Sequence, residues 1–283
     1  MHAIQLLALF AILVVYAVFD VFNKRNVPDA FAYASIGIAL LIAFVFNSSV
    51  IAFTLLLALA IGALGHVIYR LGYWGAGDYF ELVVITLILP IQPPPLLNSI
   101  SQLGMPFILS VVVATGIAAI WGVPIYYLLF VHRKGERKAR INTRHLAKGL
   151  LFICLYAMLL ALSTYLFGFT YGALALVLLL AVPSSLSMTF EDTIRRRMVE
   201  FVRTNKIEYG DMIATTMIEE KDLLRLKKID KNFGRLATKG LILSLKAWKK
   251  PLPVYKDAVP LAPFVLLGVI LALLFGNLML FLI

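Results

Sequence analysis

The sequence GYWGAGD, residues 72–78, separates two long apolar runs and ends in a carboxylate where the second run begins. An ionisable residue at or just inside a membrane boundary is costly, so Asp78 is a candidate functional residue. Glycine adopts unusual backbone angles and lets another chain approach closely, so Gly75 and Gly77 predict a permissive loop before Asp78. The alternative is a tight turn whose aspartate caps the next helix.

The composition is that of an integral membrane protein with a modest polar part. Of 283 residues, 61% are hydrophobic and 14% charged, and the mean hydropathy is +0.93. The net charge of +11 is concentrated in a few loops. This pattern indicates cytosolic loops, and without aromatic residues interleaved in a basic patch it does not suggest a nucleic-acid partner. Cys154 is the single cysteine, so no disulfide can form within the chain.

The apolar runs predict an all-α polytopic membrane protein with about eight transmembrane helices. The expected spans are residues 2–22, 30–46, 50–69, 78–89, 106–130, 150–166, 170–182 and 265–283. A small cytosolic α+β segment is expected before the last helix, with an amphipathic helix from Asp192 and short strands within residues 207–226. The expected division is a membrane domain at 1–186, a polar subdomain at 187–256 and a final helix at 257–283.

If successive spans cross the membrane in alternate directions, every connection rich in lysine and arginine lies on the same side of the membrane. By the positive-inside rule that side is the cytosol, which leaves the N-terminus outside a multi-pass protein of the cell membrane. Asp20, at the end of the first span, and Asp78, at the start of the fourth, are then expected at one depth on the cytosolic side.

Two carboxylates at one depth suggest a catalytic dyad. Close carboxylates cannot both ionise, so one can act as general base on a water while the other donates to a carbonyl oxygen. Amide hydrolysis can run on that pair without a metal. The four histidines are scattered and have no ligand spacing, and phosphate-binding and serine-nucleophile motifs are missing from the sequence. No metal or other cofactor is therefore expected.

The stretch Gly75–Asp78 resembles the GxGD signature of membrane aspartyl proteases, and among these the archaeal-type prepilin and preflagellin (prearchaellin) peptidases. Two further features carry the resemblance. Asp20 is followed by a basic loop, Lys24-Arg25, and by Val27-Pro28-Asp29, and a proline-rich stretch, residues 260–268, opens the last span.

The resemblance implies that Asp20 and Asp78 are the catalytic pair. It also implies the substrate, a type IV pilin-like or archaellin precursor whose short basic N-terminal signal peptide is removed at the cytosolic face. Glu81, Lys24 and Arg25 are the candidate substrate contacts. Glu81 lies one helical turn after Asp78 and could bind basic residues before the cleavage site, or it could be an acid favoured at a helix start.

The chain departs from the family pattern in three respects. The usual archaeal enzyme has six spans, so spans six and seven form an added hairpin. Tyr79, Phe80 and Glu81 follow the aspartate where the family often has a lysine. The bacterial cysteine-rich zinc domain has no counterpart.

Two other functions remain open at this point. Presenilin-like and signal-peptide-peptidase-like proteases also use GxGD, but with Tyr-Asp and Pro-Ala-Leu motifs, whereas Phe19 precedes Asp20 and residues 260–262 read Pro-Leu-Ala. A proton- or cation-coupled transporter could use the two aspartates as a relay, although the sequence shows no convincing internal repeat.

Overall fold

The computed structural model describes residues 2–23, 27–97, 104–130, 143–230, 233–245, 248, 250–255 and 259–278. Within them, six helices are long and apolar enough to cross a membrane. These are α1 (His2–Phe22), α2 (Asp29–Phe46), α3 (Ile51–Arg70), α5 (Phe107–Ile125), α6 (Thr143–Phe167) and α7 (Tyr171–Thr189). The prediction of a mainly helical membrane protein is confirmed.

The remaining two expected spans correspond to shorter helices. Helix α4 (Ala76–Ile88) has 13 residues and α11 (Ala262–Phe275) has 14. At about 1.5 Å per residue, 13 residues cover roughly 20 Å, less than the roughly 30 Å hydrocarbon core. The structure therefore supports six long spans and two shorter helices, and it does not establish eight full crossings. Residues 279–283 of the expected last span lie outside the described residues.

Side chains from other helices satisfy the end of α4. Pro90 prevents the helix from continuing, which leaves carbonyl groups at its C-terminus without helical partners. The Gln5 side chain donates to the Ile88 carbonyl at 2.9 Å, and the Asn47 side chain donates to the carbonyls of Leu87 and Ile88 at 3.1 and 3.2 Å. These bonds let α4 end inside the protein, where exposed backbone groups could not be solvated by lipid.

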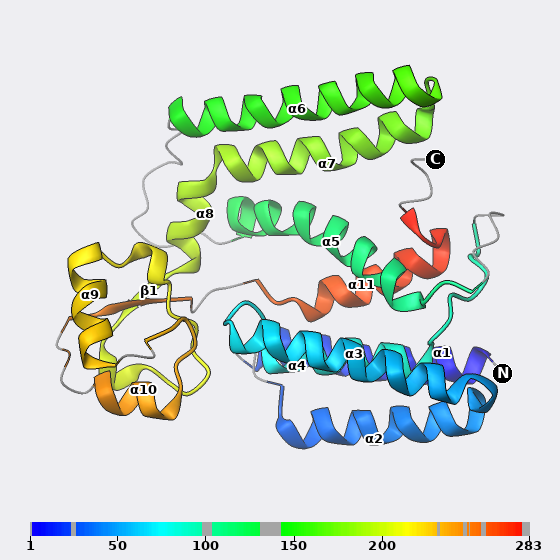
Figure 1. Ribbon diagram of the computed structural model, residues 1–283, viewed down its shortest axis with the longest axis horizontal. Coiled ribbons are helices and arrows are strands. Elements are labelled where there is room, and N and C mark those ends of the chain that lie inside the picture. Colours follow the sequence, from blue (N-terminus) through cyan, green and yellow to red (C-terminus); the bar gives the residue numbers. More distant parts are fainter. Residues whose placement is uncertain are drawn as a thin grey trace.

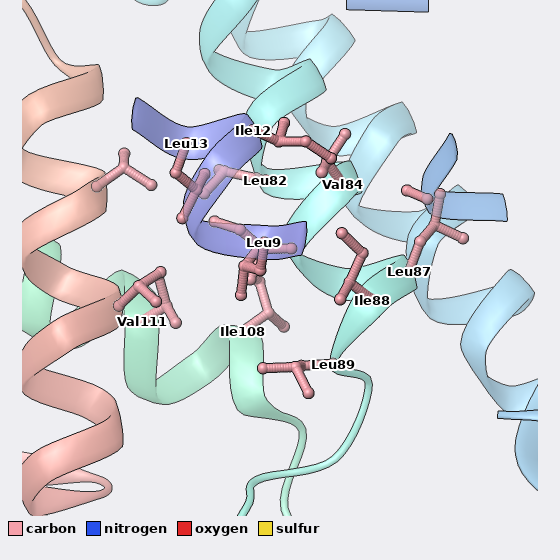
Figure 2. Packing of buried hydrophobic residues seen from close by; sticks show 14 of the residues in the cluster. Leu9, Ile12, Leu13, Leu82, Val84, Leu87, Ile88, Leu89, Ile108 and Val111 are labelled. Carbon is pink, nitrogen blue, oxygen red and sulfur yellow. The ribbon is translucent and has the colours of Figure 1, made fainter. Parts of the chain in front are cut away.

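The spans pack as a group of helices α1–α4, a central pair and an outer hairpin (Figure 1). Helix α11 packs against both α1 and α5, and α7 joins the hairpin of α6 and α7 to α5. Figure 2 shows the main core, in which side chains of α1, α4 and α5 interdigitate, among them Leu13, Leu82 and Ile108. This packing fixes the ends of α1, α4 and α11 relative to one another.

Small residues allow the short helices to pack closely on longer neighbours. A Cβ atom on Gly65 of α3 would lie 2.3 Å from Cβ of Tyr79 on α4. A Cβ atom on Gly268 of α11 would lie 2.1 Å from the Thr115 hydroxyl on α5. Glycine at these points brings the backbones together, which is how membrane helices gain packing energy.

The polar subdomain follows α7 and contains both helices and strands. It comprises α8 (Glu191–Met198), β1 (Glu200–Val202), α9 (Glu220–Ile229), α10 (Lys239–Ser244) and β2 (Leu252–Val254), with β1 and β2 antiparallel. Its own apolar core includes Ile213, Leu226 and Leu245. The amphipathic helix expected from Asp192 is confirmed as α8.

The strands expected within residues 207–226 were wrongly placed. Only isolated bridges form there, at Met212 and Ile213, and α9 begins at Glu220. The true strands lie further out, because β2, just before the last helix, supplies the partner that β1 needs. Ile207 and Ile213, two of the β-branched residues that suggested strands, instead lie in the subdomain core.

Candidate active site

Asp20 lies in the last turn of α1 and binds the start of α11. Its side chain is buried, with 7% exposure, and its Oδ2 accepts a hydrogen bond of 2.9 Å from the Ala262 amide. Ala262 is the first residue of α11, whose first-turn amides have no helical partner. Asp20 therefore fixes the last helix to the first, across 242 residues of sequence.

Asp78 lies in the first turn of α4 and is half-buried. Its Oδ2 accepts a hydrogen bond of 2.7 Å from the Gly75 amide, so Asp78 does cap its own helix. The capping geometry that the sequence allowed is thus present. Capping does not exclude a catalytic role, because only one oxygen of the Asp78 carboxylate takes part in this bond.

The glycines before Asp78 act through close approach rather than through unusual backbone angles. Gly75 has φ of −74°, and Gly77 is within α4. A Cβ atom on Gly77 would lie 2.9 Å from Cγ2 of Val27, in the segment that connects α1 with α2. In residues 72–78 the positive φ is at Gly72, at 73°. Neither Gly75 nor Gly77 has a positive φ in this conformation, and the close approach expected of this stretch is present at Gly77.

The two aspartates lie close enough for their charges to interact. Asp78 experiences electrostatic repulsion from Asp20, and Glu81 experiences repulsion from both. The structure therefore brings together three acidic side chains, near the C-terminal end of α1 and the N-terminal end of α4. The N-terminus of α11 lies beside them, since its Ala262 amide binds Asp20. Asp78 is the more accessible of the two aspartates, so a polar ligand would reach it first.

Glu81 is fully buried on α4, with 0% exposure. Neither of its carboxyl oxygens has a hydrogen-bond partner among the residues that the structure describes. Tyr16 on α1 lies close enough to interact with it electrostatically, and the Tyr16 hydroxyl is 2.9 Å from the Ser35 hydroxyl on α2. Contact between Glu81 and a substrate would require this region to open. The other candidate contacts, Lys24 and Arg25, lie outside the described residues.

The site has two carboxyl groups suited to acid–base chemistry, and the described residues around it form no cluster of metal ligands. Among the described residues, no three histidine, cysteine, aspartate or glutamate side chains are grouped so as to hold a metal ion. What the arrangement offers is two carboxylates, each with one oxygen bound by a backbone amide at the start of a helix. Such a pair can hold and activate a water molecule.

The sequence identified both aspartates but not the group that holds Asp20. That group is a backbone amide, and no side-chain pattern reveals it. The available signal was the proline-rich opening at residues 260–263, which starts a helix with unsatisfied amides.

No protein-family model, curated protein or solved structure significantly matches this chain.

Proposed function

We propose that this protein is a membrane-embedded aspartyl endopeptidase. It removes the short basic N-terminal signal peptide of type IV pilin-like or archaellin precursors, at the cytosolic face of the cell membrane. The catalytic residues are Asp20 and Asp78. The proposal builds on the GxGD resemblance and on the contacts at the ends of α1, α4 and α11.

The observation that carries the proposal is the convergence of three distant sequence features. Asp20, the stretch Gly75–Asp78 and the proline-rich opening of α11 all belong to the resemblance, yet they lie far apart in the chain. The bond from the Ala262 amide to Asp20 joins the first to the third, and the charge interaction between Asp20 and Asp78 joins the first to the second. A set of unrelated helix caps would not need to meet at one place.

In the proposed mechanism, a water molecule attacks the scissile carbonyl carbon of the precursor. One aspartate takes a proton from the water as general base, and the other, protonated, donates a hydrogen bond to the carbonyl oxygen. The backbone amides of Gly75 and Ala262 hold the two carboxylates in position. The tetrahedral intermediate then collapses as its nitrogen receives a proton, which releases the signal peptide.

The test is cleavage of a synthetic pilin-like precursor by the purified protein in detergent. Asp20→Asn and Asp78→Asn should each abolish cleavage. Asp29→Asn is the matched control, because Asp29 is an exposed aspartate in the first turn of α2 and makes the same change of charge. Wild-type turnover by either dyad variant would refute the proposal. Cleavage inside the apolar helix of the precursor would favour the presenilin-like alternative.

A second candidate is a proton- or cation-coupled transporter, which the burial of Glu81 favours. A buried acid without a partner is typical of relay sites in membrane proteins. The same purified protein in liposomes distinguishes the two functions. Ion uptake that depends on Asp20, Asp78 and Glu81 together, with no precursor cleavage, would support the transporter.

A further inference from the structure

A cavity of about 630 Å³ lies between the ends of the membrane helices and the polar subdomain. Its walls come from the segment after α3, the C-terminal part of α5, the first part of α6, the end of α7, the whole length of α8 and other parts of the subdomain. Figure 1 shows α8 connecting α7 to the subdomain at this end of the molecule. The Arg197 side chain donates to the Tyr127 carbonyl and so fixes α8 against the end of α5. The cavity is therefore bounded by ordered helices.

Positive charge exceeds negative charge around this cavity. Its charged lining residues are Lys148, Arg195 and Arg235, together with one acid, Glu191. Glu191 forms ion pairs with Lys148, at 3.2 Å, and with Arg195. One carboxylate cannot neutralise three cations, so a surplus of two positive charges remains at the wall.

Arg235 is the cation best placed to bind a ligand. It forms no ion pair with any acid in the part of the chain that the structure describes, and it is half-buried. Its guanidinium group lies 4.4 Å from the centre of the Tyr73 ring, which fixes its plane. A held guanidinium group loses little freedom when it binds a phosphate, and its planar fork suits phosphate oxygens.

The rest of the cavity wall is apolar. Met188, Met198 and Met212 line it, and methionine is a flexible side chain that adapts to apolar ligands of irregular shape. Helix α8, which lines the cavity, is amphipathic and follows α7, and amphipathic helices beside membrane spans commonly lie at the level of the lipid headgroups. A ligand suited to this site has an anionic head and apolar chains.

We propose that this cavity binds an anionic glycerophospholipid through its phosphate group. Arg235, Arg195 and Lys148 contact the phosphate, and the methionines contact the first part of the acyl chains. Basic pockets between membrane helices commonly hold such headgroups. The site is distinct from the carboxylates of the candidate active site, and the inference does not depend on the peptidase proposal.

The proposed lipid site adjoins the loop that leads to Asp78. A Cβ atom on Gly72 would lie 2.9 Å from Cβ of Arg235, so only glycine lets the subdomain approach this closely. Tyr73, the next residue, stacks on Arg235. A lipid held by Arg235 therefore contacts the wall formed by residues 72–73. Tyr73 is two residues before Gly75, whose amide donates a hydrogen bond to the Asp78 side chain.

Native mass spectrometry of the full chain in detergent tests the proposal. The probes are phosphatidylglycerol, phosphatidylcholine with the same acyl chains, and inorganic phosphate. Phosphatidylglycerol should be retained at least about tenfold more tightly than phosphatidylcholine, since two surplus cations contribute about 1 kcal/mol each. Equal retention of both lipids would overturn the proposal. Displacement of the lipid by millimolar phosphate or by an acidic peptide would overturn it in favour of a soluble anion or a protein segment.

Single variants place the binding at this cavity. Arg235→Gln should weaken phosphatidylglycerol retention about fivefold, the ratio for one cation. Arg196→Gln is the matched control, because Arg196 is exposed on α8 and does not line the cavity. Met188→Trp, which fills the cavity and leaves every charge in place, should also reduce retention. Equal losses in Arg235→Gln and Arg196→Gln, or full retention by Met188→Trp, would refute the assignment.

Discussion

Asparagine and alanine at position 20 separate catalysis from helix capping. Asparagine keeps a side-chain oxygen that can accept the hydrogen bond from the Ala262 amide, but it cannot act as a base. Loss of a general acid or base typically costs 10²–10⁴ in rate, so Asp20→Asn should lower cleavage by about a thousandfold with little change in stability. Asp20→Ala removes the acceptor as well and leaves a buried amide unsatisfied, at a cost of about 1–3 kcal/mol.

The assay combines two measurements on the same detergent preparations. Precursor cleavage reports catalysis, and chemical denaturation followed by tryptophan fluorescence reports stability. We expect both variants to be inactive and only Asp20→Ala to be less stable. The reasoning fails if Asp20→Asn retains more than a tenth of wild-type turnover. It also fails if Asp20→Ala keeps full activity, since Asp20 would then be neither base nor essential cap.

Three further predictions concern the acid on α4, the glycine loop and the topology. Glu81→Gln should reduce cleavage less than either aspartate variant. Glu81→Met should resist denaturation better than wild type, because it removes a buried carboxyl group that has no hydrogen-bond partner among the residues that the structure describes. If Glu81→Met is less stable than wild type, Glu81 has a partner that this conformation does not show. Gly77→Ala should lower cleavage, because the added methyl group would clash with Val27, and adding Val27→Ala should restore cleavage. A double variant that remains as inactive as Gly77→Ala would contradict this contact. Glu219→Cys on a Cys154→Ala background should react with impermeant reagents only after the cells are opened, and labelling of intact cells would reverse the predicted topology.

The long spans could be predicted from the sequence because their signal is local. Helix α1 matches the expected residues 2–22, and α2 and α3 begin within one residue of expectation. Helices α6 and α7 extend beyond residues 150–166 and 170–182 because polar residues at their ends pack against α8 and each other rather than marking a boundary. Hydropathy locates an apolar segment but not the point at which its helix ends.

The bounds of α4 lie within two residues of the expected span 78–89, but the groups that satisfy the ends of α4 and α11 could not be predicted because they are distant in the sequence. Gln5 and Asn47 cap the end of α4 from positions 40 or more residues away, and Gln92 donates to the Ala272 carbonyl near the end of α11. Only the tertiary fold provides the donors that make this arrangement stable.

The two aspartates were identifiable from the sequence because charge is rare in apolar runs, but their shared environment was not. Each accepts a hydrogen bond from an amide at the start of a helix, and helix starts favour negative charge. Repulsion between Asp20 and Asp78 opposes that effect. These opposing effects suit the proposed division of roles, in which one carboxylate is the base and the other the acid, and the docking of α11 supplies the amide that holds Asp20. Because Ala262 belongs to α11 and Asp20 to α1, the bond that holds the Asp20 carboxylate forms only when α11 docks on α1, so the proposed pair depends on that docking.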